Sequence, residues 1–431
     1  MGTEYAETVI IGGGQQGCGT AAALQDAGLD AVLLERGEIG RAWAEERWDS
    51  LRLRGTNRLL RFPGWRYDGD EPDGFMSGPE LAGHLRRYVA RRGLRVRRHA
   101  HVRAVERVGE DTVRFRSLLS SGEVVESRNL VAALGGYTSP RVPDLSVAVD
   151  PSVKQVHSRR YRNPEELPDG AVLVVGAGIS GQQIADELAD AGRRVFLSVG
   201  RHRAFPRCYR GRSLAEWMYA LSLYGEFATG NSPSGEGERS ALPGLPVTAT
   251  NDGRADLNLG TLARKGVVLV GSVRGADDAV VRLAENVVTV AEHAAKSFDR
   301  LLELIDEGVR ERGLPVPEQR PAPRADTEGL VDFGPSLDLR RHGITAIVWC
   351  TGFAPDYRIL PAEVLDERGA PLLRQGVRGA IPGLYFAGLP DGASLAPVGI
   401  SANVENGRFI ARQIGVDHLL RTGSKASFLD A

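Results

Sequence analysis

The residues with the clearest chemical signature in this sequence are glycines that are spaced for phosphate binding. In VIIGGGQQGCG the pattern G-x-G-x-x-G falls on Gly12, Gly14 and Gly17, directly after an apolar run. The first glycine of such a pattern permits a tight turn, the second lets the backbone approach a pyrophosphate, and the third lets a helix pack against a strand. Glu35 ends the next apolar run, where a carboxylate accepts a hydrogen bond from a ribose. This stretch therefore predicts a dinucleotide site with a free ribose hydroxyl, as in FAD.

The pattern occurs a second time about 160 residues later, in VVGAGISG, with a different continuation. The glycines and the serine of this turn are Gly176, Gly178, Gly181 and Ser180. The following apolar run leads into SVGRHRAFPR, so Arg201 and Arg203 stand where the first repeat has its acid. Basic residues at that position accommodate a 2′-phosphate. We therefore expect NADPH at the second site, with Arg201 as the main contact and Arg203 as a second one; a solvated basic loop is the alternative.

Each pattern needs a strand, a turn and a helix to position it. The sequence predicts a strand at 8–11, a helix to about residue 27 and a strand at 31–34, and then a strand at 171–175, a helix to about residue 191 and a strand at 195–199. Backbone amides at the start of each helix would hold the phosphates. Two such units in one chain suit two different dinucleotides, between which a hydride can pass.

The other elements predict that the first domain is discontinuous. An apolar strand within 128–145 runs into a Gly-Gly turn and a proline-rich linker, which marks the exit from that domain. We expect the re-entry at another apolar strand within 344–357. The predicted fold class is α/β, with two Rossmann-like dinucleotide-binding domains, the NADP domain being inserted into the discontinuous FAD domain. The predicted bounds are 1–148 and 339–431 for the FAD domain and 149–338 for the NADP domain, which contains a flexible loop at 228–246.

The bulk composition limits the classes of function. A chain of 431 residues exceeds the size at which a single core stops growing, so more than one domain is expected. The 54 basic and 55 acidic residues nearly balance, which argues against a nucleic-acid partner. The three cysteines lie far apart in the sequence, which argues against a disulfide framework and against a metal site. The N-terminus has no leader pattern and no apolar run is long enough to span a membrane, which predicts a cytoplasmic protein.

Further motifs, in the same order along the chain, resemble those of the flavin-containing monooxygenases. VHSRRYRNP matches the end of that family's F-x-G-x-x-x-H-x-x-x-F/Y at His157 and Tyr161, whereas Pro151 and Val153 replace its Phe and Gly. Trp43 and the stretch RWDSLRL that follows it resemble the segment that passes the flavin ring. The related Baeyer–Villiger enzymes prefer Trp where this chain has Tyr161, which argues against that reaction.

Two other family positions are only partly retained. VAALGG has Leu134 at the Thr position of the family's V-x-x-T-G, whereas WCTGF retains Thr351 and Gly352. Asn57 lies near the family's asparagine that supports the oxygen adduct, although its spacing to Phe62 differs.

The resemblance implies a reaction and a set of site residues. NADPH would reduce FAD, the reduced flavin would form a C4a-hydroperoxyflavin with O2, and this adduct would oxygenate a small molecule at nitrogen, sulfur or carbon. The expected FAD contacts are Gly12, Gly14, Gly17, Glu35, Arg36, Trp43, Val102, Gly135 and Gly388. The expected NADP contacts are Gly176, Gly178, Ser180, Gly181, Arg201, Arg203, His157, Thr351 and Gly352. The candidate catalytic residues are Asn57 and Tyr161, and the sequence leaves a homodimer open.

Three alternatives belong to other classes. A disulfide reductase would need a redox-active cysteine pair, and the sequence contains no C-x-x-C. An NADPH oxidase or dehydrogenase would use the same two cofactors without oxygenating a substrate. A flavin-binding regulator without turnover stays open because the family's Phe, Gly and Thr are missing at Pro151, Val153 and Leu134.

Overall fold

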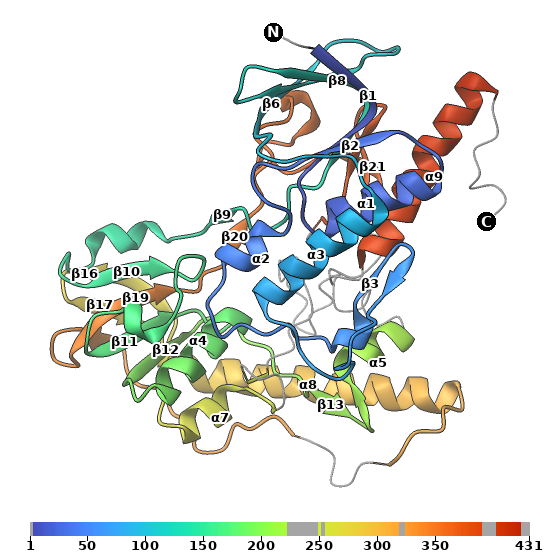
Figure 1. The fold of residues 1–431 in the computed structure, drawn as a ribbon. Helices are drawn as coiled ribbons and strands as arrows, with labels where there is room; N and C mark the ends of the chain where they lie inside the picture. Colours follow the sequence, from blue (N-terminus) through green and yellow to red (C-terminus); the bar gives the residue numbers. More distant parts are fainter. Residues whose placement is uncertain (1–2, 222–248, 251–254, 319–323, 390–401, 424–431) are drawn as a thin grey trace.

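The computed structural model describes residues 3–221, 249–250, 255–318, 324–389 and 402–423. These residues form two α/β units, and the chain passes from the first unit into the second and back again (Figure 1). Each unit is built on its own sheet, whose central strands are parallel. The flexible loop expected at 228–246 lies outside the described residues.

The first sheet holds the first glycine turn at one edge. In the described residues it has nine strands. Seven of them follow one another in the order β21 (Leu373–Gln375), β22 (Arg378–Gly379), β23 (Leu384–Phe386), β8 (Val124–Ala132), β1 (Thr3–Ile11), β2 (Ala31–Leu34) and β5 (Val96–Arg97). In addition, β7 (Phe115–Leu119) pairs with β8, and β6 (Val102–Arg107) pairs with β7. Strand β1 pairs in parallel with β2 and β8, and β8 pairs in parallel with β23. The carboxyl ends of these strands therefore share one edge, where ligands bind in open α/β sheets.

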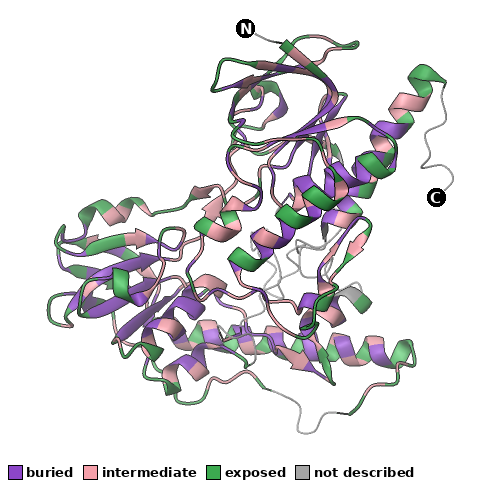
Figure 2. Ribbon diagram, viewed as in Figure 1, coloured by how far each residue is buried: buried purple, intermediate pink, exposed green. Residues whose placement is uncertain are grey.

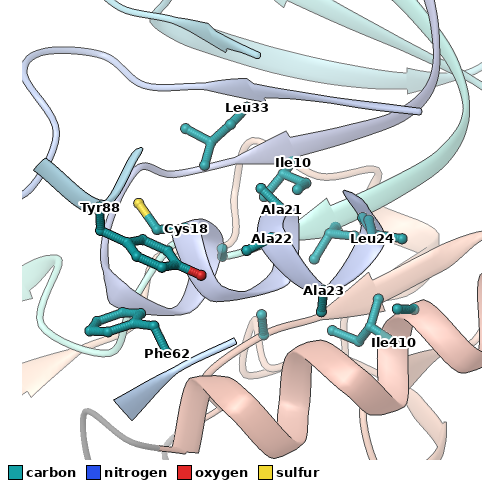
Figure 3. Close-up of a cluster of buried hydrophobic side chains, with 14 of the residues drawn as sticks. Ile10, Cys18, Ala21, Ala22, Ala23, Leu24, Leu33, Phe62, Tyr88 and Ile410 are labelled. Carbon is teal, nitrogen blue, oxygen red and sulfur yellow. The ribbon is translucent and has the colours of Figure 1, made fainter. Parts of the chain in front are cut away.

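Helix α1 (Gln15–Asp26) lies between this sheet and the last helix, α9 (Ala402–Thr422). Figure 3 shows alanine side chains of α1 between Leu33 of the sheet and Ile410 of α9. A Cβ atom on Gly19 would lie 2.4 Å from Oδ1 of Asn403, so the helices approach more closely than a larger residue would permit. The small residues that follow the glycine turn are therefore required by helix packing.

Helix α3 (Gly78–Arg92) packs beside α1 and has clear start and stop signals. The Ser77 hydroxyl accepts a hydrogen bond from the Glu80 amide, and the Glu80 carboxylate accepts one from the Ser77 amide, which is a capping box. Gly93 ends the helix in the left-handed conformation. The short helix α2 (Arg41–Glu45) lies against α3 and leads towards the second unit (Figure 1).

The second sheet has parallel strands in the order β10 (Lys154–His157), β19 (Ile344–Trp349), β11 (Ala171–Val175), β12 (Val195–Val199) and β15 (Val268–Gly271). One face packs against α4 (Ile179–Asp190) and α7 (Leu259–Arg264). The other face packs against a small antiparallel sheet of β16 (Val273–Asp277), β17 (Val280–Leu283) and β18 (Ser336–Asp338). The strands of both main sheets are accordingly among the most buried parts of the chain (Figure 2).

A separate apolar cluster joins the long helix α8 (Val287–Glu311) to α5 (Leu214–Ala220). Trp217 is fully buried in this cluster, and its indole N–H donates a 2.7 Å hydrogen bond to the Tyr209 carbonyl. The short strand pairs of the fold are β3 (Arg61–Phe62) with β4 (Trp65–Arg66), β9 (Ser139–Pro140) with β20 (Phe353–Ala354), and β13 (Cys208–Tyr209) with β14 (Arg212–Ser213). The 3-10 helices are η1 (Asn57–Leu59), η2 (Asp144–Ala148), η3 (Pro164–Glu166) and η4 (Ala362–Val364).

The structure confirms the strands and helices expected around both glycine patterns, but it corrects the expected re-entry. The apolar strand within 344–357 is β19, which pairs with β10 and β11 in the second sheet. The bound at 338/339 thus assigns β19 to the wrong unit, and the first sheet resumes only at β21. The reason is physical: a strand buried on both faces is apolar throughout in either sheet, so its residues do not indicate its neighbours.

Candidate cofactor site

The first glycine turn has the shape that a pyrophosphate requires. Gly12 has φ +113°, and a Cβ atom there would lie 2.4 Å from the Ala133 carbonyl oxygen. A Cβ on Gly17 would lie 1.9 Å from the Gly12 carbonyl oxygen, so the helix meets the turn without room for a side chain. Gly14 differs, because no atom lies within 4 Å of its Cβ position. The second glycine thus leaves an open space next to the backbone, as the pattern predicts.

The second glycine turn reproduces this geometry position by position. Gly176 has φ +108° and a Cβ position 2.6 Å from the Cys350 carbonyl oxygen. A Cβ on Gly181 would lie 1.7 Å from the Gly176 carbonyl oxygen, whereas the Cβ position of Gly178 is open. The two units therefore contain two glycine turns of equivalent geometry.

Both helices that follow the turns begin without a side-chain cap. The N-cap residues are Gly14 in α1 and Gly178 in α4, and neither provides a side chain that accepts from the first helical amides. Amides at a helix N-terminus carry a partial positive charge and need acceptors. Phosphate oxygens satisfy this need, so both turns fit a dinucleotide.

Glu35 lies beside the first turn, as expected for a ribose contact. Its Oε2 accepts a 2.6 Å hydrogen bond from the Gly13 amide, and its Oε1 accepts a 2.9 Å bond from the Gly37 amide. These bonds fix the carboxylate at the end of β2, and each oxygen keeps a further lone pair for a hydroxyl donor.

Three other expected FAD contacts also gather near the start of α1. The Trp43 indole N–H donates a 2.9 Å hydrogen bond to Oε1 of Gln15. A Cβ on Gly388 would lie 2.6 Å from Cγ of Gln16. Gly135 has φ +78° and an open Cβ position shortly after Ala133, the residue that touches Gly12. The turn, α2 and the segment after β23 thus meet at one place.

Two expected FAD contacts, Arg36 and Val102, have side chains that interact with other parts of the protein. Arg36 follows Glu35, and its guanidinium reaches Glu46 at 3.4 Å. Val102 is buried at the start of β6 and packs into the core of the first sheet. A contact of Val102 with a cofactor would therefore involve its backbone.

Three expected NADP contacts outside the second glycine turn cluster around the segment that follows β19: His157, Thr351 and Gly352. The His157 ring nitrogen Nε2 lies 3.0 Å from the Gly352 carbonyl oxygen, to which it donates, and Nδ1 accepts from the Arg159 amide. Burial lowers the pKa of His157, which favours this neutral form. The Thr351 hydroxyl donates to the Arg141 carbonyl. Because Cys350 touches Gly176, the structure brings these residues together with the second glycine turn.

The basic segment after β12 contains a residue that the sequence analysis did not single out. Arg201 is exposed and Arg203 is half-buried, so Arg201 is the freer of the two to meet a phosphate. Between them His202 is buried, with Nδ1 3.4 Å from the Ala177 carbonyl oxygen and 3.3 Å from Nε2 of Gln182. Burial lowers the pKa of His202 to about 4. This neutral histidine attaches the arginine segment to the glycine turn.

The two candidate catalytic residues have structural partners. The Asn57 amide donates a 2.8 Å hydrogen bond to the Glu71 carbonyl, and its Oδ1 accepts a 3.1 Å bond from the Met76 amide. The Tyr161 hydroxyl donates a 2.8 Å bond to Glu187, and burial raises the pKa of Tyr161. Asn57 thus closes a loop of the first unit, and Tyr161 lies in the core of the second.

Asn57 also lines a cavity of about 570 Å³ between α3 and the loop at 57–77. Its aromatic lining includes Trp65, Tyr67 and His84, and the Trp65 and His84 rings are 4.0 Å apart between centroids. Of the site residues expected from the sequence, Asn57 alone is part of this lining.

The junction between the units contains Glu46, which sequence reasoning missed. Its carboxylate forms a two-pronged ion pair with Arg159, at 2.7 and 3.1 Å, and also contacts Arg41 at 2.9 Å. Burial raises the pKa of Glu46, but the hydrogen bond and charge of Arg159 outweigh this effect and hold the pKa below its ordinary value. Glu46 and Arg159 are 113 positions apart, so no local pattern could pair them.

Arg47, the next residue, is half-buried at the same junction. Its guanidinium lies 5.4 Å from the Trp43 ring centroid and 5.5 Å from that of Tyr137, and burial lowers its pKa. The following residues Trp48 and Leu51 belong to the core of the second unit. The segment that resembles the family's flavin-passing stretch is therefore inserted between the two units.

The cysteines give no support to disulfide chemistry. Cys18, Cys208 and Cys350 are all unpaired, and burial raises the pKa of Cys18 to about 12. Within the described ranges, no three histidine, cysteine or acidic residues lie close enough together to hold a metal ion. Nor does any described helix have both the length and the apolar character that crossing a bilayer requires.

Comparisons with known proteins agree with this geometry. Residues 9–210 match the family described as pyridine nucleotide-disulphide oxidoreductase. A protein of Geobacillus kaustophilus named uncharacterized oxidoreductase CzcO-like is 28% identical over 388 residues, which cover 89% of this chain and 91% of that protein. The indole-3-pyruvate monooxygenase YUCCA1 of Oryza sativa subsp. japonica is 30% identical over 194 residues, 44% of this chain and 47% of that protein.

The fold is similar to that of a solved flavin monooxygenase. A mutant of the flavin monooxygenase from Stenotrophomonas maltophilia superposes with a TM-score of 0.67 at 19% identity, over 95% of this chain and 98% of that one. The expected pair of cofactors, FAD and NADPH, is that of the flavin monooxygenases. In sequence the chain is therefore similar to a bacterial oxidoreductase and a plant monooxygenase, and in fold it is similar to a flavin monooxygenase.

Proposed function

We propose that this protein is an NADPH- and O2-dependent flavoprotein monooxygenase that oxygenates a small molecule at nitrogen, sulfur or carbon. The proposal rests on two equivalent glycine turns, the first of which is followed in the chain by an acidic residue and the second by a basic one. Glu35 follows the first turn and suits the ribose of FAD, whereas Arg201 follows the second and suits the 2′-phosphate of NADPH. A hydride could then pass from one dinucleotide to the other within one chain.

The chain's own residues would bind, orient and shield the cofactors. The open positions at Gly14 and Gly178 would admit the two pyrophosphates, and the uncapped helix starts would donate to them. Reduced FAD would supply the oxygen chemistry through the C4a-hydroperoxyflavin that the resemblance implies. The half-buried side chains of Arg47 and Trp43, with the partly exposed ring of Tyr137 beside Arg47, would help to exclude water, which would otherwise release peroxide from the adduct.

The test follows the flavin spectrum of the purified protein. We expect NADPH to bleach the flavin without air, and stopped-flow mixing with O2 to give an adduct that absorbs near the blue edge of the visible range and lives longer with NADP+ present. Immediate reoxidation with stoichiometric peroxide, whatever candidate substrate is added, would instead identify an oxidase. Flavin uptake without any reduction by NADPH would point to the regulator.

A further inference from the structure

A second cavity, of about 380 Å³, lies in the first unit away from both glycine turns. Its walls come from β8, the β21–β22 hairpin, the turn before β23 and the last turns of α9. The Gly383 carbonyl, which belongs to this lining, accepts a 2.8 Å hydrogen bond from the Leu130 amide. Because Gly383 directly precedes β23, the cavity lies towards the amino ends of the parallel strands, opposite the edge that holds the cofactor turn.

The lining of this cavity is strongly basic. Five arginines line it: Arg114, Arg128, Arg374, Arg378 and Arg421. Among the described residues of the lining, Asp417 is the only carboxylate. Its Oδ2 lies at 3.5 Å from the Tyr385 hydroxyl, which donates to it.

Most of these positive charges are not neutralised by acids. Arg114 and Arg128 donate to the backbone carbonyls of Glu110 and Asp111, which carry no formal charge. Arg374 and Arg378 form no ion pair within the described part of the chain. Of these five arginines, Arg421 is the one with a carboxylate partner among the described residues, which is Glu7 at 2.6 Å.

The guanidinium groups around the cavity repel one another, and a bound anion would relieve this repulsion. Burial, and then the charges of Arg114 and Arg421, lower the pKa of Arg128, so the guanidinium groups repel one another. Gly383 has φ +81°, and a Cβ there would lie 3.0 Å from Nη1 of Arg114. A side chain at this position would therefore crowd the Arg114 guanidinium.

We propose that this cavity binds a compact anion that carries phosphate groups. Guanidinium groups pair with phosphate oxygens in a two-pronged geometry, and several of them around one cavity favour a multiply charged ligand. The volume of the cavity falls within the range of small-ligand sites. The site is separate from both dinucleotide turns and does not depend on the proposed reaction.

The test is calorimetric titration of the full chain with inorganic pyrophosphate. Excess FAD and NADP+ are present throughout, so that phosphate binding at the glycine turns is already saturated. We expect one pyrophosphate to bind per chain, and the affinity to fall as salt is added. The variant Arg374→Gln/Arg378→Gln should bind roughly tenfold more weakly or worse, and it should fold because neither side chain loses an ion pair to any residue that the structure describes.

The matched control is Arg103→Gln/Arg341→Gln, which removes the same charge from exposed positions outside the cavity. Its affinity for pyrophosphate should equal that of the unchanged protein. The proposal is overturned if the unchanged protein binds no pyrophosphate, if the two double variants behave alike, or if citrate binds as tightly as pyrophosphate.

Discussion

At the scale of single residues, the proposed contact of Arg201 with the 2′-phosphate predicts how the protein distinguishes NADPH from NADH. Changing Arg201 to Ala removes a charge-assisted hydrogen bond of roughly 1.5 to 3 kcal/mol, which is about a 10- to 150-fold loss of NADPH affinity. NADH lacks the 2′-phosphate, so its affinity should barely change. Rates of flavin reduction over a range of each cofactor measure both values.

Arg203 provides the control for this prediction. It is less exposed than Arg201 and could take over part of the contact, so the double variant should show the larger loss. An unchanged NADPH to NADH preference in the double variant would show that this segment does not read the phosphate.

His202 makes the stability of the second unit depend on pH. Its pKa is about 4 in the folded protein, against about 6.5 in an unfolded chain. As pH falls below about 6.5, His202 is protonated in the unfolded chain before it is protonated in the folded protein. The free energy of unfolding therefore decreases until the pH reaches the pKa of His202 in the folded protein. Between pH 7.5 and pH 5 this loss is about 2 kcal/mol.

Urea unfolding at these two pH values tests the assignment. His202→Asn should be less stable at pH 7.5 but should lose less stability on acidification than the unchanged protein. The control is His101→Asn, because His101 is exposed, and its pH dependence should match that of the unchanged protein. Equal slopes for all three proteins would exclude the buried neutral histidine as the cause.

At the scale of elements, the two glycine turns allow a reciprocal experiment. Gly14→Val and Gly178→Val each place a side chain in open space, so both variants should fold. The first should purify without FAD and still bind NADP+, whereas the second should retain FAD that NADPH no longer reduces. Absorbance of the purified protein and NADP+ titration measure the two outcomes. Full FAD content in Gly14→Val would mean that the first turn is not the flavin site.

The turns were predictable because their chemistry is local. The spacing of Gly12 and Gly17 follows from one turn and the helix start, and the same reasoning gave the second unit its strands and helix. Strand β19 was assigned to the wrong unit, because its partner strands are chosen by tertiary packing. Tyr161 bonds to Glu187 and Glu46 pairs with Arg159, and these partners lie outside the local sequence of Tyr161 and Glu46. No local sequence pattern could therefore predict these contacts.

At the scale of the whole molecule, the two units are connected through the Glu46 carboxylate. Glu46→Gln keeps the shape but leaves the nearby guanidinium groups of Arg36, Arg41 and Arg159 without their shared counter-charge. We expect a loss of about 1 to 3 kcal/mol in the free energy of unfolding near neutral pH. The folded pKa of Glu46 is lowered, so its ion pair with Arg159 stabilises the folded protein fully at pH values above the unfolded pKa. The difference in unfolding free energy between the unchanged protein and Glu46→Gln should therefore disappear as pH falls through the folded pKa.

The neighbouring Glu45→Gln is the matched control for this prediction. Among the described residues Glu45 forms an ion pair with Arg41 alone, and its side chain is 56% exposed, so its loss should change the unfolding free energy by less than about 0.5 kcal/mol. Denaturant unfolding of both variants would contradict the assignment if the two losses were equal.

The pairing of β23 with β8, and of α9 with α1, also sets an order of events during synthesis. The residues of the second unit leave the ribosome before β23 and α9 exist, so that unit can fold while the first sheet still lacks its last strands. The surface of α1 that later contacts Asn403 stays uncovered during this interval. A nascent chain stalled before residue 384 should therefore protect the second unit from protease while α1 is cut. Flavin capture would then wait for the final helix, which makes it one of the last steps in the maturation of this protein.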